Sequence, residues 1–229
     1  MARIVLAYML ISFIGRLRIF IALTSVLFIE KLVKIKSKKS VMFKTNDYWE
    51  EEFTEYDDKK LDSIYFENCT FIKCNFSQSL FDSCKFTECT FINCDLSLVT
   101  LKNCTFNDVT FKISKLIGIS WSTCVEPFDV IFDTCNISQN SFHLLDLRRI
   151  KFISSLIEDT GFEECNLEKA LFDDCDLKQT VFINNNLKKS NFETSKNYLI
   201  NPQQNDISKA QFSLPEALSF LSLLPIQIK

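Results

Sequence analysis

The sequence predicts an all-β solenoid in which the chain winds into a four-walled coil of stacked parallel strands. A large apolar residue recurs at every fifth position over two long runs, and a small residue often precedes it by two positions. Neither the helical period of 3.6 nor the strand period of 2 divides this pattern. A chain that turns one corner per five residues closes a square every twenty, and such coils stack about 4.8 Å apart as parallel ladders.

The first run extends from Leu61 to Trp121, and its centres are Phe, Leu or Trp. The position two residues before each centre is mostly Cys or Ser. We expect the centres to fill the interior of the coils, with the small residues making room for them. The candidate core residues of this run are Phe66, Phe71, Phe76, Phe86, Phe91, Phe106, Phe111 and Trp121.

The second run extends from Phe132 to Phe192 and lies one residue out of phase with the first. Leu or Ile occupies every centre between its phenylalanines, which predicts Phe on two opposite walls and smaller residues on the other two. Residues 122–129, which include Pro127, are expected to form a bulge or short loop between the runs. The candidate core residues of this run are Phe132, Phe142, Phe152, Phe162, Phe172, Phe182 and Phe192.

Both ends of a stacked coil need a cover, because their backbone groups have no further coil to pair with. Residues 42–60 are expected to form an acidic N-terminal cap, 61–195 the repeat solenoid, and 196–229 a C-terminal cap. In the N-terminal cap we expect Trp49, Phe53 and Tyr56 to plug the coil. Ser213 to Glu216 is typical of a capping box, which predicts a short helix at 214–223 followed by a strand at 226–228. We expect that helix to bury Leu214, Ala217, Leu218 and Leu221.

Residues 1–41 differ in physical class from the rest of the chain. They carry eight basic and one acidic side chain, and Arg16 and Arg18 separate two apolar runs. A membrane helix at 17–34 would be short, and the lysines after it would hold the downstream body in the cytoplasm. A signal peptide fits less well, because the basic cluster follows the apolar run. The alternative is a mis-set start, with translation from Met42.

Composition limits the classes of function. Residues 61–195 carry twelve basic and nineteen acidic side chains, which disfavours direct binding of nucleic acid through its phosphates. Nine of the ten cysteines fall on the small position, where we expect reduced, buried side chains without disulfides or metal. His143, the single histidine, is expected on the surface, and no nucleophile or phosphate-loop motif is present. We predict no enzyme activity and no cofactor.

Units such as CTFIK, CNFSQ, CKFTE, CTFIN and CNLEK resemble the pentapeptide-repeat family over residues 61–195. The resemblance implies a right-handed quadrilateral parallel β-helix. The C-terminal sequence is also similar to the end of a set of bacterial pentapeptide-repeat proteins that begin near the equivalent of Met42, which favours the mis-set start. In related proteins this end makes a dimer contact, so the resemblance implies either a homodimer through the C-terminal cap or a lid without a partner.

Two functions of different class stay open. The first is a scaffold with an unknown protein partner. The second follows from the resemblance to the quinolone-resistance type, which implies a DNA-mimicking binder of DNA gyrase or topoisomerase IV, although the two long loops of that type are missing here. A cytoplasmic location is predicted, and membrane anchoring is the alternative if residues 1–41 are expressed. The candidate contact residues are Asp133, Asp173 and Glu193 on one acidic edge and the exposed Ile72 and Ile92 on one column.

Overall fold

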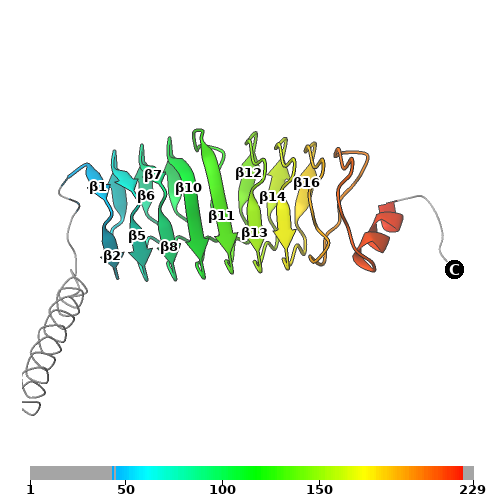
Figure 1. The fold of residues 1–229 in the computed structure, drawn as a ribbon, viewed down its shortest axis with the longest axis horizontal. Coiled ribbons are helices and arrows are strands. Elements are labelled where there is room, and N and C mark those ends of the chain that lie inside the picture. The colour runs from blue at the N-terminus through cyan, green and yellow to red at the C-terminus, as the bar shows by residue number, and fades with distance from the viewer. Residues whose placement is uncertain (1–42, 44, 224–229) are drawn as a thin grey trace, which may run out of the picture. The chain divides into compact units, whose positions relative to one another are not determined.

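The computed structural model describes residue 43 and residues 45–223, and the structural statements below concern these residues. Residues 1–41, expected to be a membrane segment or mis-set start, and the strand expected at 226–228 lie outside them. The described chain is nearly all β and stacks in about seven turns along one axis, from β1 (Asp47–Trp49) to the helix η1 (Glu216–Leu223) (Figure 1). It therefore has the solenoid architecture that the five-residue period predicts.

Most strands are three residues long, because each one ends at the next corner of the coil. After β1, the strands in chain order are β2 (Glu52–Thr54), β3 (Lys60–Asp62), β4 (Tyr65–Glu67), β5 (Thr70–Ile72), β6 (Leu80–Asp82), β7 (Lys85–Thr87), β8 (Thr90–Ile92), β9 (Thr100–Lys102), β10 (Thr105–Lys112), β11 (Phe128–Asp133), β12 (Ser141–His143), β13 (Lys151–Ile153), β14 (Gly161–Glu163), β15 (Leu171–Asp173) and β16 (Val181–Ile183).

Every strand pair in the described residues is parallel, and the register is set by the coil length. One wall carries the pairs β2–β5, β5–β8, β8–β10, β10–β11, β11–β13 and β13–β15. We call this wall the long face, because its ladder passes the break between the two runs without a gap. The opposite wall carries β3, β6 and β9 in one sheet and β12, β14 and β16 in another.

The core behind the long face is an unbroken stack of aromatic rings. Phe71 and Phe91 have ring centroids 4.5 Å apart with planes 9° apart, and Phe132 and Phe152 lie 5.3 Å apart at 2°. In the C-terminal half this stack meets the rings of the opposite wall edge-on, as Phe172 does with Phe182 at 80°. Both arrangements are favourable for aromatic rings. The members of the stack are Phe53, Phe71, Phe91, Phe111, Phe132, Phe152, Phe172, Phe192 and Phe212.

Most corners of the coil use one residue in the left-handed conformation. These residues follow the core centre by two positions, as Asn68 (φ 51°) and Lys73 (φ 54°) do. The position accepts many residue types, although Asn and Gly fit it best. Ile113 and Thr134 are the β-branched residues found there among the described corners.

The break predicted at 122–129 is shorter than expected. The loop covers residues 122–127, and Phe128 already belongs to β11, where it pairs with Phe106 of β10. The register between β10 and β11 then shifts, so that Val109 pairs with Val130. The interval between paired residues is 22 at Phe106 and Phe128 and 21 at Val109 and Val130, compared with 20 in a regular coil. The coil at the break therefore has one additional residue, which explains why the second run is one residue out of phase with the first.

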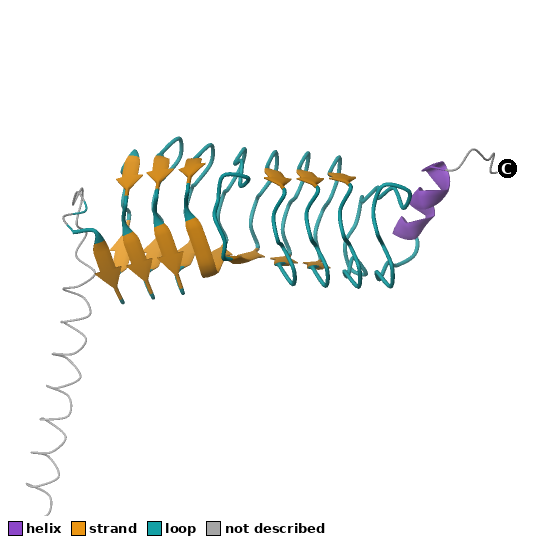
Figure 2. Cartoon of the chain, turned by 90° about the horizontal axis from the view of Figure 1, so that it is seen from above, coloured by secondary structure: helices purple, strands orange, loops and turns teal. Residues whose placement is uncertain are grey.

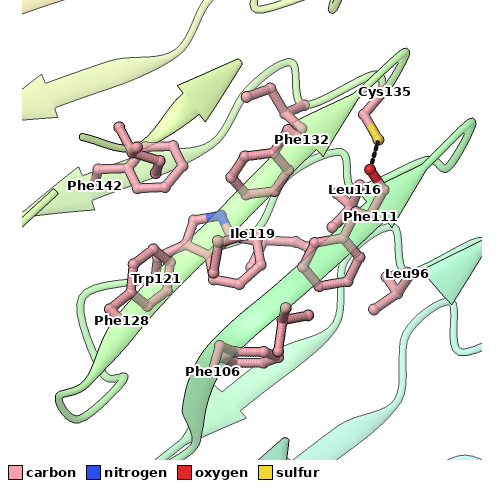
Figure 3. Packing of buried hydrophobic residues seen from close by; sticks show 14 of the residues in the cluster. Leu96, Phe106, Phe111, Leu116, Ile119, Trp121, Phe128, Phe132, Cys135 and Phe142 are labelled. Carbon is pink, nitrogen blue, oxygen red and sulfur yellow. Dashed lines mark hydrogen bonds between the residues drawn. The ribbon is translucent and has the colours of Figure 1, made fainter. Parts of the chain in front are cut away.

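Trp121 fills the interior at this break (Figure 3). Its ring lies edge-on to Phe106 and Phe132, at centroid distances of 5.5 and 5.8 Å, and stacks on Phe142 with planes 6° apart. One large ring therefore contacts the last coil of the first run and the first coil of the second. The aromatic core is continuous where the five-residue pattern is not.

The ladder extends further at both ends than the boundaries 61 and 195. At the N-terminus β1 and β2 pair with β4 and β5 at a spacing of 18 residues, which the five-residue count does not detect. At the C-terminus Asn191 still bridges to Gln211. Trp49 does not plug the coil as expected, since it is 56% exposed, whereas Tyr56 is buried. The reason is that residues 47–54 form strands of an additional coil, on which Trp49 faces outward.

The C-terminal helix differs from the one predicted. It is a 3₁₀ helix, and Leu214 and Leu218, expected to be buried, are 75% and 55% exposed. Phe220 instead packs against Phe212, with ring centroids 5.0 Å apart. Glu216 accepts a hydrogen bond from the main-chain N–H of Asn197 at 2.8 Å, so this carboxylate binds the last coil and leaves the predicted capping box unformed.

Among the described residues no helix is long and apolar enough to cross a bilayer.

Candidate functional site

The interior of the coil is filled, so candidate sites lie on its outer walls. The fifteen candidate core residues, from Phe66 to Phe192, are each at most 3% exposed. The small residue two positions before each centre also forms hydrogen bonds. At several of these positions the side chain donates to the main-chain carbonyl of a core centre in the preceding coil, as Cys135 does to Phe111 at 3.3 Å (Figure 3) and Ser195 to Phe172 at 2.8 Å.

The cysteines of this position are buried thiols inside the coil. All ten cysteines are unpaired and nine are buried. Burial raises the pKa of Cys135 and of Cys175 to about 12, because a thiolate in the core would lose its hydration. The thiolate is the form that attacks electrophiles and binds metals, so these side chains act as small hydrogen-bonding core residues. In the described part of the chain no three His, Cys, Asp or Glu residues lie close enough together to hold a metal ion.

The five candidate contact residues all lie on the long face, in one column. Ile72 pairs with Ile92, and Asp133 and Asp173 flank Ile153 in the same register. Glu193 follows one coil later, next to Phe192, whose ring stacks on Phe172. The acidic edge and the isoleucine column, which the sequence treats as two separate features, are therefore the two ends of one surface. Lys112 joins them, in register with Ile92 and with Asp133.

The two ends of this column differ in hydrogen bonding. Ile72 and Ile92 are half-buried, in contrast to the exposure expected from the sequence, because neighbouring strands flank each of them. At the acidic end Thr194 donates to Asp173 at 2.8 Å, and Ser154 donates to Asp174 at 3.1 Å. These bonds hold the carboxylates in place on the wall. The column therefore presents a rigid apolar end and a rigid acidic end.

On the opposite wall His143 is half-buried and lies in register with Glu163. Its neighbours at this column of the wall are Ser122, Glu163 and Ile183, and among the described residues no hydrogen bond joins His143 to any of them, since the hydroxyl of Ser122 bonds to that of Ser120. The histidine therefore has the outward position that the sequence predicts, and its surroundings carry no recognisable catalytic arrangement.

Sequence reasoning missed a line of basic residues at one corner of the C-terminal half. Arg149, Lys169, Lys189 and Lys209 occupy the left-handed corner position of successive coils, with φ between 57° and 64°. Main-chain bonds stack them, since the N–H of Arg149 donates to Glu168 and that of Lys169 to Lys188. We call these four residues the basic ridge. Counting charges column by column at intervals of twenty would have found it, whereas the net charge of the segment hides it.

The sequence matches the family described as a pentapeptide repeat region at residues 64–126 and again at residues 125–197. The two matches meet at the break, and together they cover more than half of the chain. The chain belongs to the pentapeptide-repeat family. No curated protein matches the sequence.

Several solved structures of pentapeptide-repeat proteins are similar to this one. A trypsin-treated form of QnrB1, a plasmid-mediated fluoroquinolone resistance protein, is 15% identical, with a TM-score of 0.39, and the match covers 80% of this chain and all of that one. HetL, a pentapeptide-repeat protein involved in heterocyst differentiation regulation in the cyanobacterium Nostoc, is 13% identical, with a TM-score of 0.49, covering 81% of this chain and 94% of that one. A pentapeptide-repeat protein from the thylakoid lumen of Arabidopsis thaliana is 19% identical, with a TM-score of 0.19, covering 61% of this chain and 86% of that one.

Proposed function

We propose that this pentapeptide-repeat protein is a non-enzymatic scaffold that binds a protein partner through the long face. The observation that carries the proposal is the single column that joins Ile72 and Ile92 to Asp133, Asp173 and Glu193. The wall beneath it is stiff, because each strand is hydrogen-bonded to both neighbours and backed by stacked rings. A flat, rigid surface that combines apolar and charged side chains suits contact with another protein, whereas small molecules bind in concave sites.

The chemistry of the described side chains supports a binding role over catalysis. Catalysis needs a reactive group held near a base or a charge stabiliser, in a site that excludes water. Here nine of the ten thiols are buried, burial raises the pKa of Cys135 and Cys175, and His143 lies on an outer wall. We therefore expect the purified protein to act through its surface.

A comparison of two surface variants tests the scaffold proposal. The long-face variant combines Ile92→Lys with Asp133→Lys and Asp173→Lys. Its control places the same side chain at three positions of the opposite wall, through Asp82→Lys, Glu163→Lys and Ile183→Lys. Affinity purification from the native host, with quantitative mass spectrometry, should give a protein that is retained by the native chain and by the control and lost by the long-face variant. Equal retention by both variants would contradict the role of the long face.

DNA mimicry is the second function that the sequence leaves open. The acidic residues Asp133 and Asp173 support it by sign, but Ile153 separates them, and the basic ridge runs along the same coils. A duplex mimic needs a continuous negative surface along the rod. We therefore expect residues 42–229 to leave supercoiling by DNA gyrase and topoisomerase IV unchanged at micromolar concentration. Inhibition or quinolone protection at that concentration would restore the hypothesis.

A homodimer through the C-terminal cap stays a proposal, which the exposure of Leu214 and Leu218 supports. Sedimentation equilibrium would show a dimer that Leu214→Glu with Leu218→Glu dissociates, while Leu199→Glu, another exposed leucine near this end, serves as the control. A monomer at all concentrations would leave the cap as a lid without a partner.

The cytoplasmic location also stays a proposal, and the intact mass of the native protein would show whether residues 1–41 are present.

A further inference from the structure

The basic ridge is a continuous positive surface on a chain whose repeat region is acidic overall. Its four residues lie one above the next at the strand spacing of about 4.8 Å, so they span about 14 Å. Next to it, Arg148 is paired with Asp146 and Lys188 with Asp206. The carboxylates nearby do not neutralise the ridge: Glu168 is shared by Lys169 at 3.7 Å and Lys189 at 3.5 Å. Arg149 and Lys209 form no ion pair with any described residue.

The same corner has the opposite sign in the N-terminal half. There the left-handed residues of the corresponding coils are Asn68, Glu88 and Asp108. The positive surface therefore begins at the break and extends toward the C-terminus. Glu88 and Asp108 would repel an anionic ligand that extended past the break, so the anion-binding surface ends at the break.

A groove of about 530 Å³ lies at this end of the ridge, where the break loop overhangs the first two corners. Pro127 of the loop and Phe128 of β11 form its apolar side. The basic residues Arg148, Arg149 and Lys169 line it together with four carboxylates, so the groove is mixed in character. These carboxylates belong to Glu126, Asp129, Asp146 and Glu168. A ligand with one apolar side chain followed by acidic residues would therefore fit this part of the molecule, with the apolar side chain in the groove and the acidic residues along the basic ridge.

We propose that the groove and the basic ridge bind an extended acidic segment of a partner protein. The segment would place an apolar side chain against Pro127 and Phe128 and its carboxylates beside Arg149, Lys169, Lys189 and Lys209. About four extended residues cover the 14 Å of the ridge. A protein segment fits better than nucleic acid, because it can place an uncharged apolar side chain in the groove beside Glu126 and Asp129, whereas every nucleotide carries a phosphate that these carboxylates would repel. This surface lies outside the column used in the proposed function and is independent of it.

A synthetic peptide tests the proposal directly. The probe is a fluorescein-labelled peptide of one leucine followed by six glutamates, titrated with the full chain in low salt and followed by fluorescence anisotropy. The ridge variant combines Arg149→Gln with Lys169→Gln, Lys189→Gln and Lys209→Gln. Gln already occupies the same backbone position at Gln78, Gln139 and Gln179, so the variant should keep the fold.

The control variant removes four positive charges from the N-terminal half, through Lys73→Gln, Lys85→Gln, Lys102→Gln and Lys112→Gln. We expect the ridge variant to bind the peptide about 10-fold to 30-fold more weakly than the native chain, and the control to bind it within about 3-fold. Equal weakening in both variants would show a general charge effect and overturn the proposal. Tighter binding of a twenty-nucleotide thymidine oligonucleotide than of the peptide would overturn the partner class. Failure of the long-face variant leaves this test unaffected.

Discussion

The two halves of the solenoid share one core but differ in their walls. In the coils of the first run three walls carry strands, whereas in the second run two opposite walls do, and the remaining sides are turns (Figure 2). The turn walls have Asn or Asp directly before most centres, and its side chain accepts from the main-chain N–H two residues on. Asn75 accepts from Ser77 at 3.1 Å, and Asn166 from Glu168 at 3.3 Å. The comparison teaches that Asn or Asp before the centre favours a turn, although Lys115 and Leu156 hold this position on turn walls as well, while the apolar centre is common to strand and turn.

The largest change in stability is expected in the aromatic core, and it tests whether the core is equivalent in the two halves. Phe91 in the first half and Phe172 in the second each contact four aromatic rings, two stacked and two edge-on or tilted toward edge-on. We expect Phe91→Ala and Phe172→Ala to lower the free energy of unfolding by the same amount, about 3–5 kcal/mol, because each leaves a similar cavity. Urea denaturation of both variants measures it. A difference of more than about 1.5 kcal/mol would show that the wall type changes the core.

The second-largest loss of stability is expected at the small position two residues before each core centre. The Oγ of Ser195 donates to Phe172 and accepts from the N–H of Cys175 at 3.1 Å. Ser195→Val should cost about 1–3 kcal/mol, because it leaves buried peptide groups without partners. Cys135→Ser should cost less than about 1 kcal/mol, since Ser155 one coil later makes the equivalent bond to Phe132. If Cys135→Ser proved as costly as Ser195→Val, the thiol would have a role beyond this bond.

Much of this arrangement follows from the sequence, because the coil is built from local rules that repeat. The five-residue period fixes the interior residues, and the interval of twenty fixes which residues stack within each run, so Ile72 beside Ile92 and Asp133 in line with Asp173 can be written from the numbering. That these two pairs lie in one column needs the register between β10 and β11, where the interval is 21. The added N-terminal coil escapes the count because its spacing is 18 residues. The half-buried state of Ile92 depends on the bulk of neighbouring strands, which a periodic pattern does not give.

The basic ridge shows a different limit of the sequence reasoning. Its residues are periodic and could be found by reading the corner column, but a charge summed over 61–195 cancels them against acids on other walls. The groove beside it required the structure, since the path of the loop at Pro127 and the shift between β10 and β11 decide what the loop covers. A loop without periodicity has no rule that sets its position.

The corner residues provide a smaller test, in which a stabilising change is expected. Ile113 closes the first half with a φ of 51°, and its side chain is 62% exposed. A β-branched residue is strained in this conformation, whereas Asn tolerates it. Ile113→Asn should therefore raise the free energy of unfolding by about 0.5–1 kcal/mol, and Asn93→Ile, one coil earlier in the same column, should lower it by a similar amount. Thermal denaturation compares the two, and a loss of stability in both would indicate that Ile113 makes a contact of its own.

The smallest effect concerns the charges that distinguish the C-terminal turn wall. Asp206 accepts from the hydroxyl of Ser208 at 2.6 Å and from Lys188 at 2.9 Å, and these bonds lower its pKa to about 2. Because the folded pKa lies below the unfolded value of about 3.9, the stabilisation is present above about pH 4 and is lost as the pH falls toward 2. The pair is exposed, so Asp206→Asn should lower Tm by less than about 2 °C at pH 7, and the difference should vanish near pH 2. The control is Asp95→Asn in the N-terminal half, which keeps the turn acceptor for Ser97 and removes no described ion pair. A Tm difference for Asp206→Asn that persisted at pH 2 would show that its role is the shape of the turn and not its charge.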